Sequence, residues 1–212
     1  MKSRNVLILC ILITVVLSML FGKKIIFEFE YLFPAPVGWK SYVAYALLDV
    51  NSFPENWKHS IDSPYNLYTD PEINHVYRAW GQSDGKSGSA EESIWRAYSD
   101  FQAYDFYNQL INSQIHFKNK KGDFRIDFHP PKEIDYTSKT ADKDYLACGW
   151  YVDAYCDYFA KYKNYVLYLH IEREDAINNQ HSDGLSYQEI EDILVRADIK
   201  MNEYLKSNLI IQ

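Results

Sequence analysis

The stretch that decides the fold runs from Asp144 to Glu172 and reads DYLACGWYVDAYCDYFAKYKNYVLYLHIE. Apolar and polar side chains alternate along much of it, and a period of two residues is typical of β-strands. We expect strands at 144–151, 155–162 and 165–172, with the two residues 163–164 forming a tight turn. The stretch therefore predicts an antiparallel meander.

The two-residue turn also predicts the register of the strands. Three pairs of directly opposed residues then share one apolar face: Ala160 with Leu167, Tyr158 with Leu169, and Cys156 with Ile171. If the first hairpin turns at Val152, Cys148 lies across from Cys156 on that face. Opposed residues have Cα atoms about 4.5–5.5 Å apart, which a disulfide can span. We predict a Cys148–Cys156 disulfide, and hence an oxidising compartment.

Two alternatives remain open for these cysteines. Cys148 precedes Gly149 and Trp150, which faintly resembles the surroundings of a cysteine-protease nucleophile, but the second Cys of that signature is absent. A zinc site would need a second pair of ligands, which the Cys-x7-Cys spacing lacks. The disulfide is the preferred interpretation.

The opposite face of the meander carries a second candidate for catalysis. The same register places Asp157 across from His170, with Glu172 two residues further along. An Asp–His pair can act as a general base, or join Glu172 in a metal site. A cross-strand polar pair on a solvated sheet face is the plainer interpretation. Asp157 and His170 are therefore weak catalytic candidates, and the sequence motifs predict no metal site and no cofactor.

Two amphipathic helices are expected to pack on this sheet. Ser99 and Gln102 form a capping box before an apolar face made of Phe101, Tyr104, Tyr107, Leu110 and Ile111. Ser186 and Glu189 form another before the stripe Ile190, Ile193, Leu194, Ala197, Met201, Tyr204 and Leu205. Alternatively, the first helix starts at Ser89, and it would then include residues 93–98, which otherwise predict a strand.

The remaining segments complete an α+β plan. Ile73 to Trp80 and Ser93 to Tyr98 predict a hairpin, and residues 115–128 predict a second one. Residues 58–72 are expected to form a loop, because they carry two prolines and many polar side chains. We expect an antiparallel sheet packed by two helices, one layer on another, in a single domain over residues 38–212.

The N-terminus predicts a membrane anchor over residues 1–24. Val6 to Phe21 reads VLILCILITVVLSMLF, and as a helix it would cover roughly 24 Å, somewhat less than the ~30 Å hydrocarbon core. A cleaved signal peptide and a buried helix are the alternatives, but Ser18 to Gly22 matches a cleavage site poorly. The positive charges before the run favour a single-pass protein of the cell membrane with its domain outside. Residues 25–37 would form a stalk or an edge strand.

Composition excludes several classes of function. The chain has 212 residues, of which 17% are aromatic, and a net charge of -7 that rises to about -11 over residues 25–212. Such an acidic surface argues against a nucleic-acid partner and against lying flat on anionic lipid. The aromatic excess suggests recognition of sugar rings or peptides, with Trp57, Trp80 and Trp95 as weak binding candidates. Filling of the core is the alternative role for these rings.

A set of small motifs resembles a loose group of uncharacterised bacterial surface proteins. These motifs are Leu47–Leu48 with Phe53–Trp57, the helix from Ser99 to Leu110, Ala141–Asp142, Cys148 and Cys156, Ala160–Val166, and the closing helix with Asp198 and Met201. Group members are membrane-anchored or lipoprotein-like extracytoplasmic domains with a sensor-like outline. The resemblance covers residues 42–205 and implies an α+β fold and an extracytoplasmic address. It brings no defined activity.

The sequence thus predicts a membrane-anchored extracytoplasmic module of binding or sensor-like type. Its N-terminal helix would bind the membrane, and its domain would bind a protein or an envelope polysaccharide. The alternative is a small surface hydrolase that uses the region of Asp157 and His170. A hydrolase should present a concave pocket with perturbed titratable groups, whereas a binding module should present exposed aromatic or apolar surface.

Overall fold

The computed structural model describes most of one compact unit, Gly38–Gln212. The described residues are Val43, 46–59, 68–70, 75–82, 88–97, 99–116, 128–150, 153–174 and 184–209. The predicted anchor and stalk (1–37), the hairpin tip at 83–87 and the turn at Val152 lie outside them. In the part of the chain that is described, no helix is long and apolar enough to cross a membrane.

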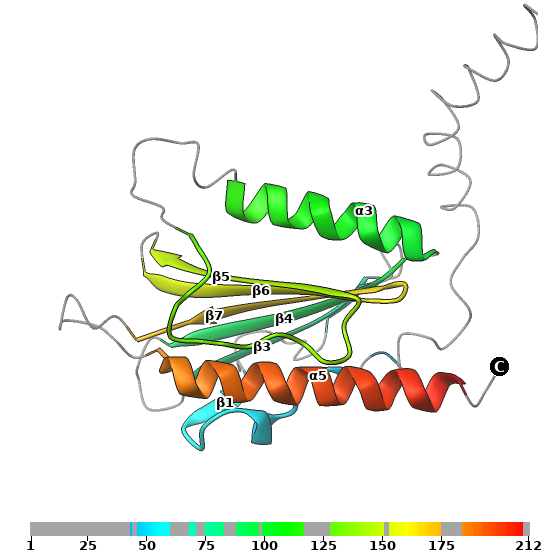
Figure 1. Cartoon of the computed structure of the whole chain (residues 1–212). Helices are drawn as coiled ribbons and strands as arrows, with labels where there is room; N and C mark the ends of the chain where they lie inside the picture. Colours follow the sequence, from blue (N-terminus) through cyan, green and yellow to red (C-terminus); the bar gives the residue numbers. More distant parts are fainter. Residues whose placement is uncertain are drawn as a thin grey trace, which may run out of the picture. The chain divides into compact units, whose positions relative to one another are not determined.

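The described residues contain one antiparallel sheet of seven strands (Figure 1). The strands are β1 (Trp57–His59), β2 (Tyr68–Asp70), β3 (His75–Gln82), β4 (Ser89–Arg96), β5 (Lys143–Trp150), β6 (Ala154–Tyr162) and β7 (Tyr165–Glu172). Their order is β1-β3-β4-β7-β6-β5, and β2 pairs with the same edge of β3 as β1 does. The α+β class with an antiparallel sheet and two helices is as predicted.

The predicted meander is confirmed with its register. Strands β5, β6 and β7 pair as expected, with Asp157 opposite His170 and Cys148 opposite Cys156. The Sγ atoms of the two cysteines lie 2.03 Å apart, at disulfide distance. The register follows from the short turn, in which Lys163 takes a φ of 53° and reverses the chain within two residues.

The β3–β4 hairpin is also confirmed, whereas two other predictions were wrong. Strands β1 and β2 lie within or next to residues 58–72, which were expected to form a loop. They are three residues long and pair with an edge, so they show no period of their own. Ile115, the expected start of the second hairpin, lies in a π-helical turn, η3 (Asn112–His116), that continues the preceding helix. Residues 117–127 of that predicted hairpin lie outside the described residues.

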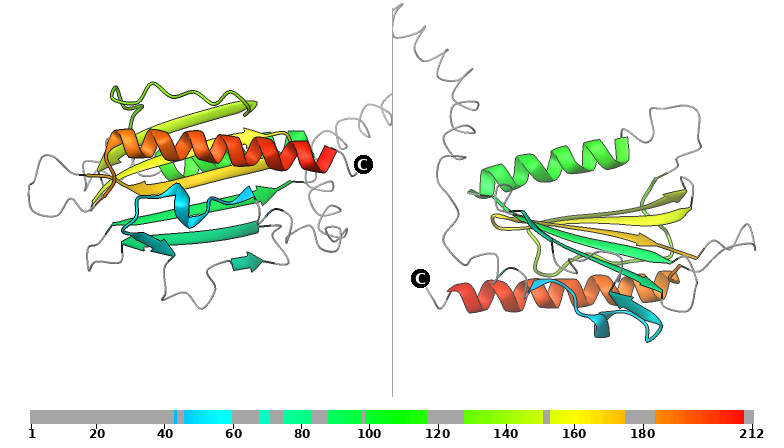
Figure 2. Two further views of the ribbon diagram at one scale, coloured as in Figure 1. Left: turned by 90° about the horizontal axis from the view of Figure 1, so that it is seen from below. Right: turned by 180° about the vertical axis from the view of Figure 1, so that it is seen from behind.

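The two helices cover opposite faces of the sheet (Figure 2). Helix α3 (Asp100–Ile111) packs on β6 and β7 from one side, and α5 (Tyr187–Leu209) lies on the other. The expected arrangement of one layer on another was therefore wrong: the sheet is the middle of three layers. Both of its faces carry apolar side chains, and each face needs a cover.

The face under α5 holds the larger share of the core. Its buried side chains come from alternate strand positions, such as Tyr158 and Leu169, and from the predicted stripe of α5. Six of the seven stripe residues are buried, from Ile190 to Tyr204. The capping box of α5 is present, since the carboxylate of Glu189 accepts hydrogen bonds from the backbone N–H and the hydroxyl of Ser186.

The face under α3 has a smaller core. It consists of Ala103, Tyr107, Ile115, Phe128, Ala147, Phe159 and Val166. The helix begins where predicted, because the Ser99 hydroxyl accepts a hydrogen bond from the backbone N–H of Gln102 at 3.2 Å. The alternative start at Ser89 is excluded, since Ser89 belongs to β4.

Residues 46–52 are held by side chains from β3, β4 and α5. The buried carboxylate of Glu92 accepts a hydrogen bond from the Leu48 N–H at 2.8 Å, and Arg78 donates to the Leu48 carbonyl at 2.5 Å. From α5, Arg196 donates to the Asn51 carbonyl, and Lys200 forms an ion pair with Asp49 at 3.0 Å. This segment ends in a short 3-10 turn, η2 (Val50–Ser52).

Candidate functional site

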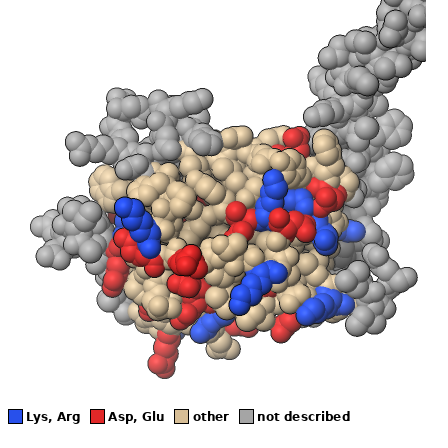
Figure 3. Space-filling view, viewed as in Figure 1, with Lys and Arg blue, Asp and Glu red and all other residues tan. Residues whose placement is uncertain are grey.

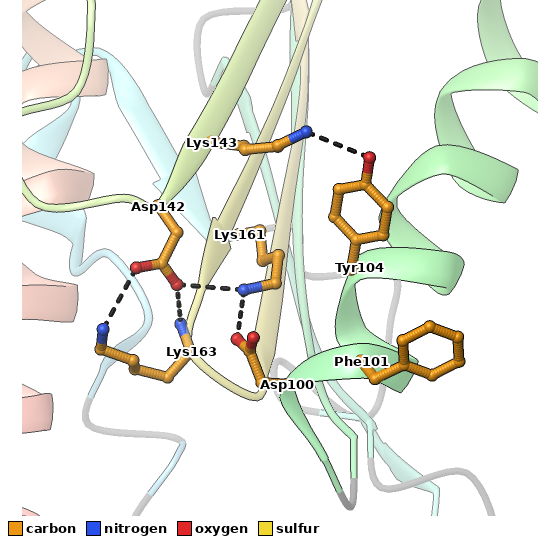
Figure 4. Close-up of a pocket in the computed structure, with 7 residues that line it drawn as sticks. All are labelled: Asp100, Phe101, Tyr104, Asp142, Lys143, Lys161 and Lys163. Carbon is orange, nitrogen blue, oxygen red and sulfur yellow. Dashed lines mark hydrogen bonds and ion pairs between the residues drawn. The ribbon is translucent and has the colours of Figure 1, made fainter.

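An open pocket of about 600 Å³ lies where the first turn of α3 faces the ends of β5 and β6 (Figure 4). We call it the α3 pocket and define it by its lining residues: Asp100, Phe101, Tyr104, Asp142, Lys143, Lys161 and Lys163. The aromatic rings come from α3, and the lysines come from β5, β6 and the turn after β6. Positive and negative side chains lie side by side on this face of the molecule (Figure 3).

The aromatic wall of the pocket is exposed. Phe101 is 61% exposed and Tyr104 is 40% exposed, one helical turn apart. The prediction that these two rings belong to the buried face of α3 was wrong. Tyr107 of that predicted face is buried as expected, and Ala103 takes the other inward position, since a small residue lets the helix approach the sheet closely.

A buried ammonium group forms the base of the pocket. The side chain of Lys161 is 4% exposed, and its Nζ lies 2.5 Å from Asp100 Oδ1 and 3.0 Å from Asp142 Oδ2. Burial alone would lower the pKa of Lys161, but the hydrogen bonds and charges of the two aspartates outweigh it and raise this pKa. Lys161 is therefore held in its charged form.

Asp142 joins this base to the β6–β7 turn. Its carboxylate accepts a hydrogen bond from the backbone N–H of Lys163 at 2.7 Å and pairs with the Lys163 Nζ at 3.2 Å. Burial would raise the pKa of Asp142, but the bonds from Lys161 and Lys163 lower it below its ordinary value. Lys161 and Asp142 thus have fixed positions, whereas the side chain of Lys163 is 75% exposed.

The third lysine of the pocket faces a ring rather than a carboxylate among the described residues. The Nζ of Lys143 lies 4.3 Å from the centroid of the Tyr104 ring and 3.2 Å from its hydroxyl oxygen. This hydrogen bond lowers the pKa of Tyr104. The contact orients the exposed ring of Tyr104 and leaves the charge of Lys143 at the rim.

The predicted pair Asp157 and His170 is formed, on the same face of the sheet as α3. Asp157 is fully buried, and its Oδ1 lies 2.6 Å from Nδ1 of His170, whose side chain is 21% exposed. The Tyr168 hydroxyl donates to the same oxygen at 3.0 Å, and the Tyr155 ring stacks on His170 with centroids 4.5 Å apart. Burial, with Asp157 beside it, raises the pKa of Tyr168.

Glu172 does not join this pair. Its carboxylate accepts hydrogen bonds from the backbone N–H and the hydroxyl of Ser89, both at 3.1 Å. Burial raises the pKa of Glu172. Within the described ranges, no three His, Cys, Asp or Glu side chains gather in a way that could hold a metal ion.

The tryptophan candidates lie in the core or against it. Trp57 and Trp80 are each 1% exposed, and both contact Phe53. They occupy strand positions that face the α5 side, so their rings are not at the surface. Trp95 is half-buried, stacked on His75 at 4.5 Å and edge-on to Phe106 of α3. Cys148 is bonded to Cys156, so it carries no thiolate for the nucleophile alternative.

Sequence reasoning missed the α3 pocket. Lys161 lies on the same face of β6 as Asp157, which alternation predicts to be the solvated face, so the strand pattern gave no sign that this lysine is buried. A lysine is almost never buried without a carboxylate partner. Asp142 and Asp100, at the starts of β5 and α3, were available partners, but their approach depends on the tertiary fold.

Comparisons with known proteins add no identity to this geometry. No protein-family model matches the chain, and neither a curated protein nor a solved structure matches it.

Proposed function

We propose that this protein is a membrane-anchored extracytoplasmic module that works by binding, and that the α3 pocket is its binding site. The observation that carries the proposal is the pair of exposed rings, Phe101 and Tyr104, beside charges that are already fixed. Exposed aromatic surface next to polar groups is typical of recognition sites. Asp100 and Asp142 are both paired with Lys161, which suits them to hold a ligand rather than to transfer protons.

The proposed address rests on two features. The apolar run Val6 to Phe21 favours a single-pass anchor in the cell membrane. The cysteine pair at disulfide distance is typical of proteins outside the cytoplasm. The partner would then be a protein or a polysaccharide of the envelope.

The binding site is tested with two matched aromatic variants of the full chain in mild detergent. Phe101→Ala removes a ring of the pocket, whereas Trp150→Ala removes a ring that is 38% exposed at the far end of β5. Each protein is sedimented with the insoluble polysaccharide fraction of bacterial envelopes and, separately, with an envelope protein fraction. We expect most of the Phe101→Ala protein to stay in the supernatant, whereas the Trp150→Ala protein should sediment with the envelope material. Equal retention of both variants would contradict the proposal.

The address is tested by alkylating thiols in intact cells that express the chain, with and without reductant. We expect Cys148 and Cys156 to resist labelling until reductant is added, and a protease added outside to digest the domain. Labelling of both cysteines without reductant, together with protection from the protease, would place the domain in the cytoplasm.

A small surface hydrolase is the second candidate, and the geometry of His170 favours it. The buried Asp157 bonds Nδ1 of His170, which leaves Nε2 as the nitrogen that could act as a base. The rings of Tyr155 and Tyr168 lie beside it, with centroids 4.5 Å and 6.3 Å from that of His170. This candidate predicts turnover of chromogenic ester or glycoside substrates that His170→Gln abolishes and Phe101→Ala leaves intact.

A further inference from the structure

We propose that the ligand of the α3 pocket is a saccharide that carries a carboxylate, that is, a uronic acid residue. This inference rests on the proposed function and names the chemical class of its ligand. Three kinds of group in the pocket support it: aromatic rings, lysines and aspartates. They match the apolar face, the carboxylate and the hydroxyl groups of such a sugar.

The first match is between the exposed rings and the apolar face of a pyranose. Phe101 and Tyr104 offer ring faces from successive turns of α3, at the open side of the pocket. An aromatic face carries partial negative charge and attracts the C–H groups that line one side of a sugar ring. The open form of the pocket suits a ligand that lies along it, such as one unit of a chain.

The second match is between the rim lysines and a carboxylate. The side chain of Lys163 is 75% exposed, and Lys143 lies over the Tyr104 ring. Both ammonium groups retain N–H donors, since each has three. A carboxylate between them would form charge-assisted hydrogen bonds, which are about twice as strong as neutral ones.

The third match is between the aspartates and hydroxyl groups. Asp100 is 72% exposed on its side chain, and its Oδ1 bonds Lys161. An ionised carboxylate has about four acceptor sites, so oxygens of Asp100 and Asp142 can accept from sugar O–H groups. The same two carboxylates repel ligands of high negative charge density, which disfavours polyphosphates in a chain of net charge -7.

The pocket is also arranged before any ligand arrives. Lys161 is buried between two carboxylates, and Asp142 is bonded to the backbone of the turn. Polar groups that are already fixed lose little conformational entropy on binding. This matters for sugars, because each hydrogen bond to a sugar replaces one to water and so contributes little net free energy of binding.

The test compares tetragalacturonate, its methyl ester and a tetraglutamate peptide by calorimetric titration of the full chain in detergent. We expect the acid to bind about tenfold more tightly than the ester. The free energy of one charge-assisted hydrogen bond to the carboxylate is enough to explain a tenfold difference in Kd. Lys143→Gln with Lys163→Gln should abolish that difference, so that acid and ester bind equally well to the variant. Phe101→Ala should weaken both saccharides about tenfold or more.

Two controls keep the result specific to the pocket. Lys206→Gln removes an exposed lysine in the last turn of α5, and Trp150→Ala removes an exposed ring elsewhere; neither should change an affinity. Equal binding of acid and ester, or tighter binding of tetraglutamate, would overturn the inference. If no probe binds but Phe101→Ala still loses retention on envelope material, the saccharide class fails and the binding function stands. If Phe101→Ala also retains normally there, both fail.

Discussion

At the scale of single residues, Lys161 is the group on which the α3 pocket depends. Its ammonium lies between Asp100 and Asp142, and both carboxylates are within 3.0 Å of it. Without it, two like charges would face one another. Because both aspartates keep contact with solvent, they can be rehydrated, and the cost stays below that of a fully buried pair.

Lys161→Met should therefore lower the free energy of unfolding by about 1–2 kcal/mol, since it keeps the apolar stem and removes the charge. The pKa of Asp142 should rise, because its hydrogen bond to Lys161 is lost. Urea denaturation and carboxylate NMR titration measure the two effects. Adding Asp142→Asn should recover part of the loss, and no recovery would show that packing, not charge, is responsible.

Glu92 contributes to the pH dependence of stability. It is fully buried, and burial raises its pKa to about 8. The hydrogen bond from Leu48 and the charges of Arg78 and Lys200 lower this pKa, but by less than burial raises it. Asp49 is a further charged group near this site, paired with Lys200. The folded pKa lies above the ordinary value of 4.5, so the folded state binds the proton more tightly. Its contribution to stability is full below pH 4.5 and is lost as the pH rises through about 8.

Glu92→Gln should remove this dependence, because the amide oxygen can still accept from the Leu48 N–H without titrating. Between pH 5 and 8 the wild-type chain should lose up to about 1.4 kcal/mol per pH unit relative to the variant. Urea unfolding at four pH values measures the difference. Parallel profiles of the two proteins would contradict the prediction.

At the scale of elements, the cap of α3 connects helix stability to the site. Ser99 is the N-cap, and the next two residues of the helix, Asp100 and Phe101, line the α3 pocket. Ser99→Ala should cost about 1 kcal/mol, whereas Ser99→Asn should cost little, because Asn also accepts from the first turn. Thermal unfolding compares the two variants. An equal loss in both would show that the hydroxyl of Ser99 has another role.

The sequence predicts elements well where one period dominates. The meander and its register follow from alternation and a two-residue turn, and the stripe of α5 follows from a single apolar row. Helix α3 was harder, because aromatic side chains occur all around it and amphipathicity does not select one face. There Ala103, rather than the largest rings, marks the side that faces the sheet. The exposed rings and the buried Lys161 of the site depend on that choice, so they could not be predicted.

At the scale of the whole molecule, the disulfide joins two neighbouring strands near an edge of the sheet. Cys148 and Cys156 are both buried on the α5 face and lie eight residues apart in sequence. Cys148→Ala with Cys156→Ala should lower the free energy of unfolding by about 2–3 kcal/mol, the range for a short closed loop. Chemical denaturation of the oxidised protein and the double variant measures this. A smaller change on reduction of the wild type than in the variant would assign part of the loss to packing.

The hydrogen bonds and the ion pair that hold residues 46–52 have a mechanical consequence. If the chain is tethered through its N-terminal segment, a pull on the domain enters at this point. The load then divides between Glu92 and Arg78 on central strands and Arg196 and Lys200 on α5. Because these contacts come from two strands and a helix, the loss of any one of them leaves the others in place, so the segment should resist a pull better than a strand held along one edge alone.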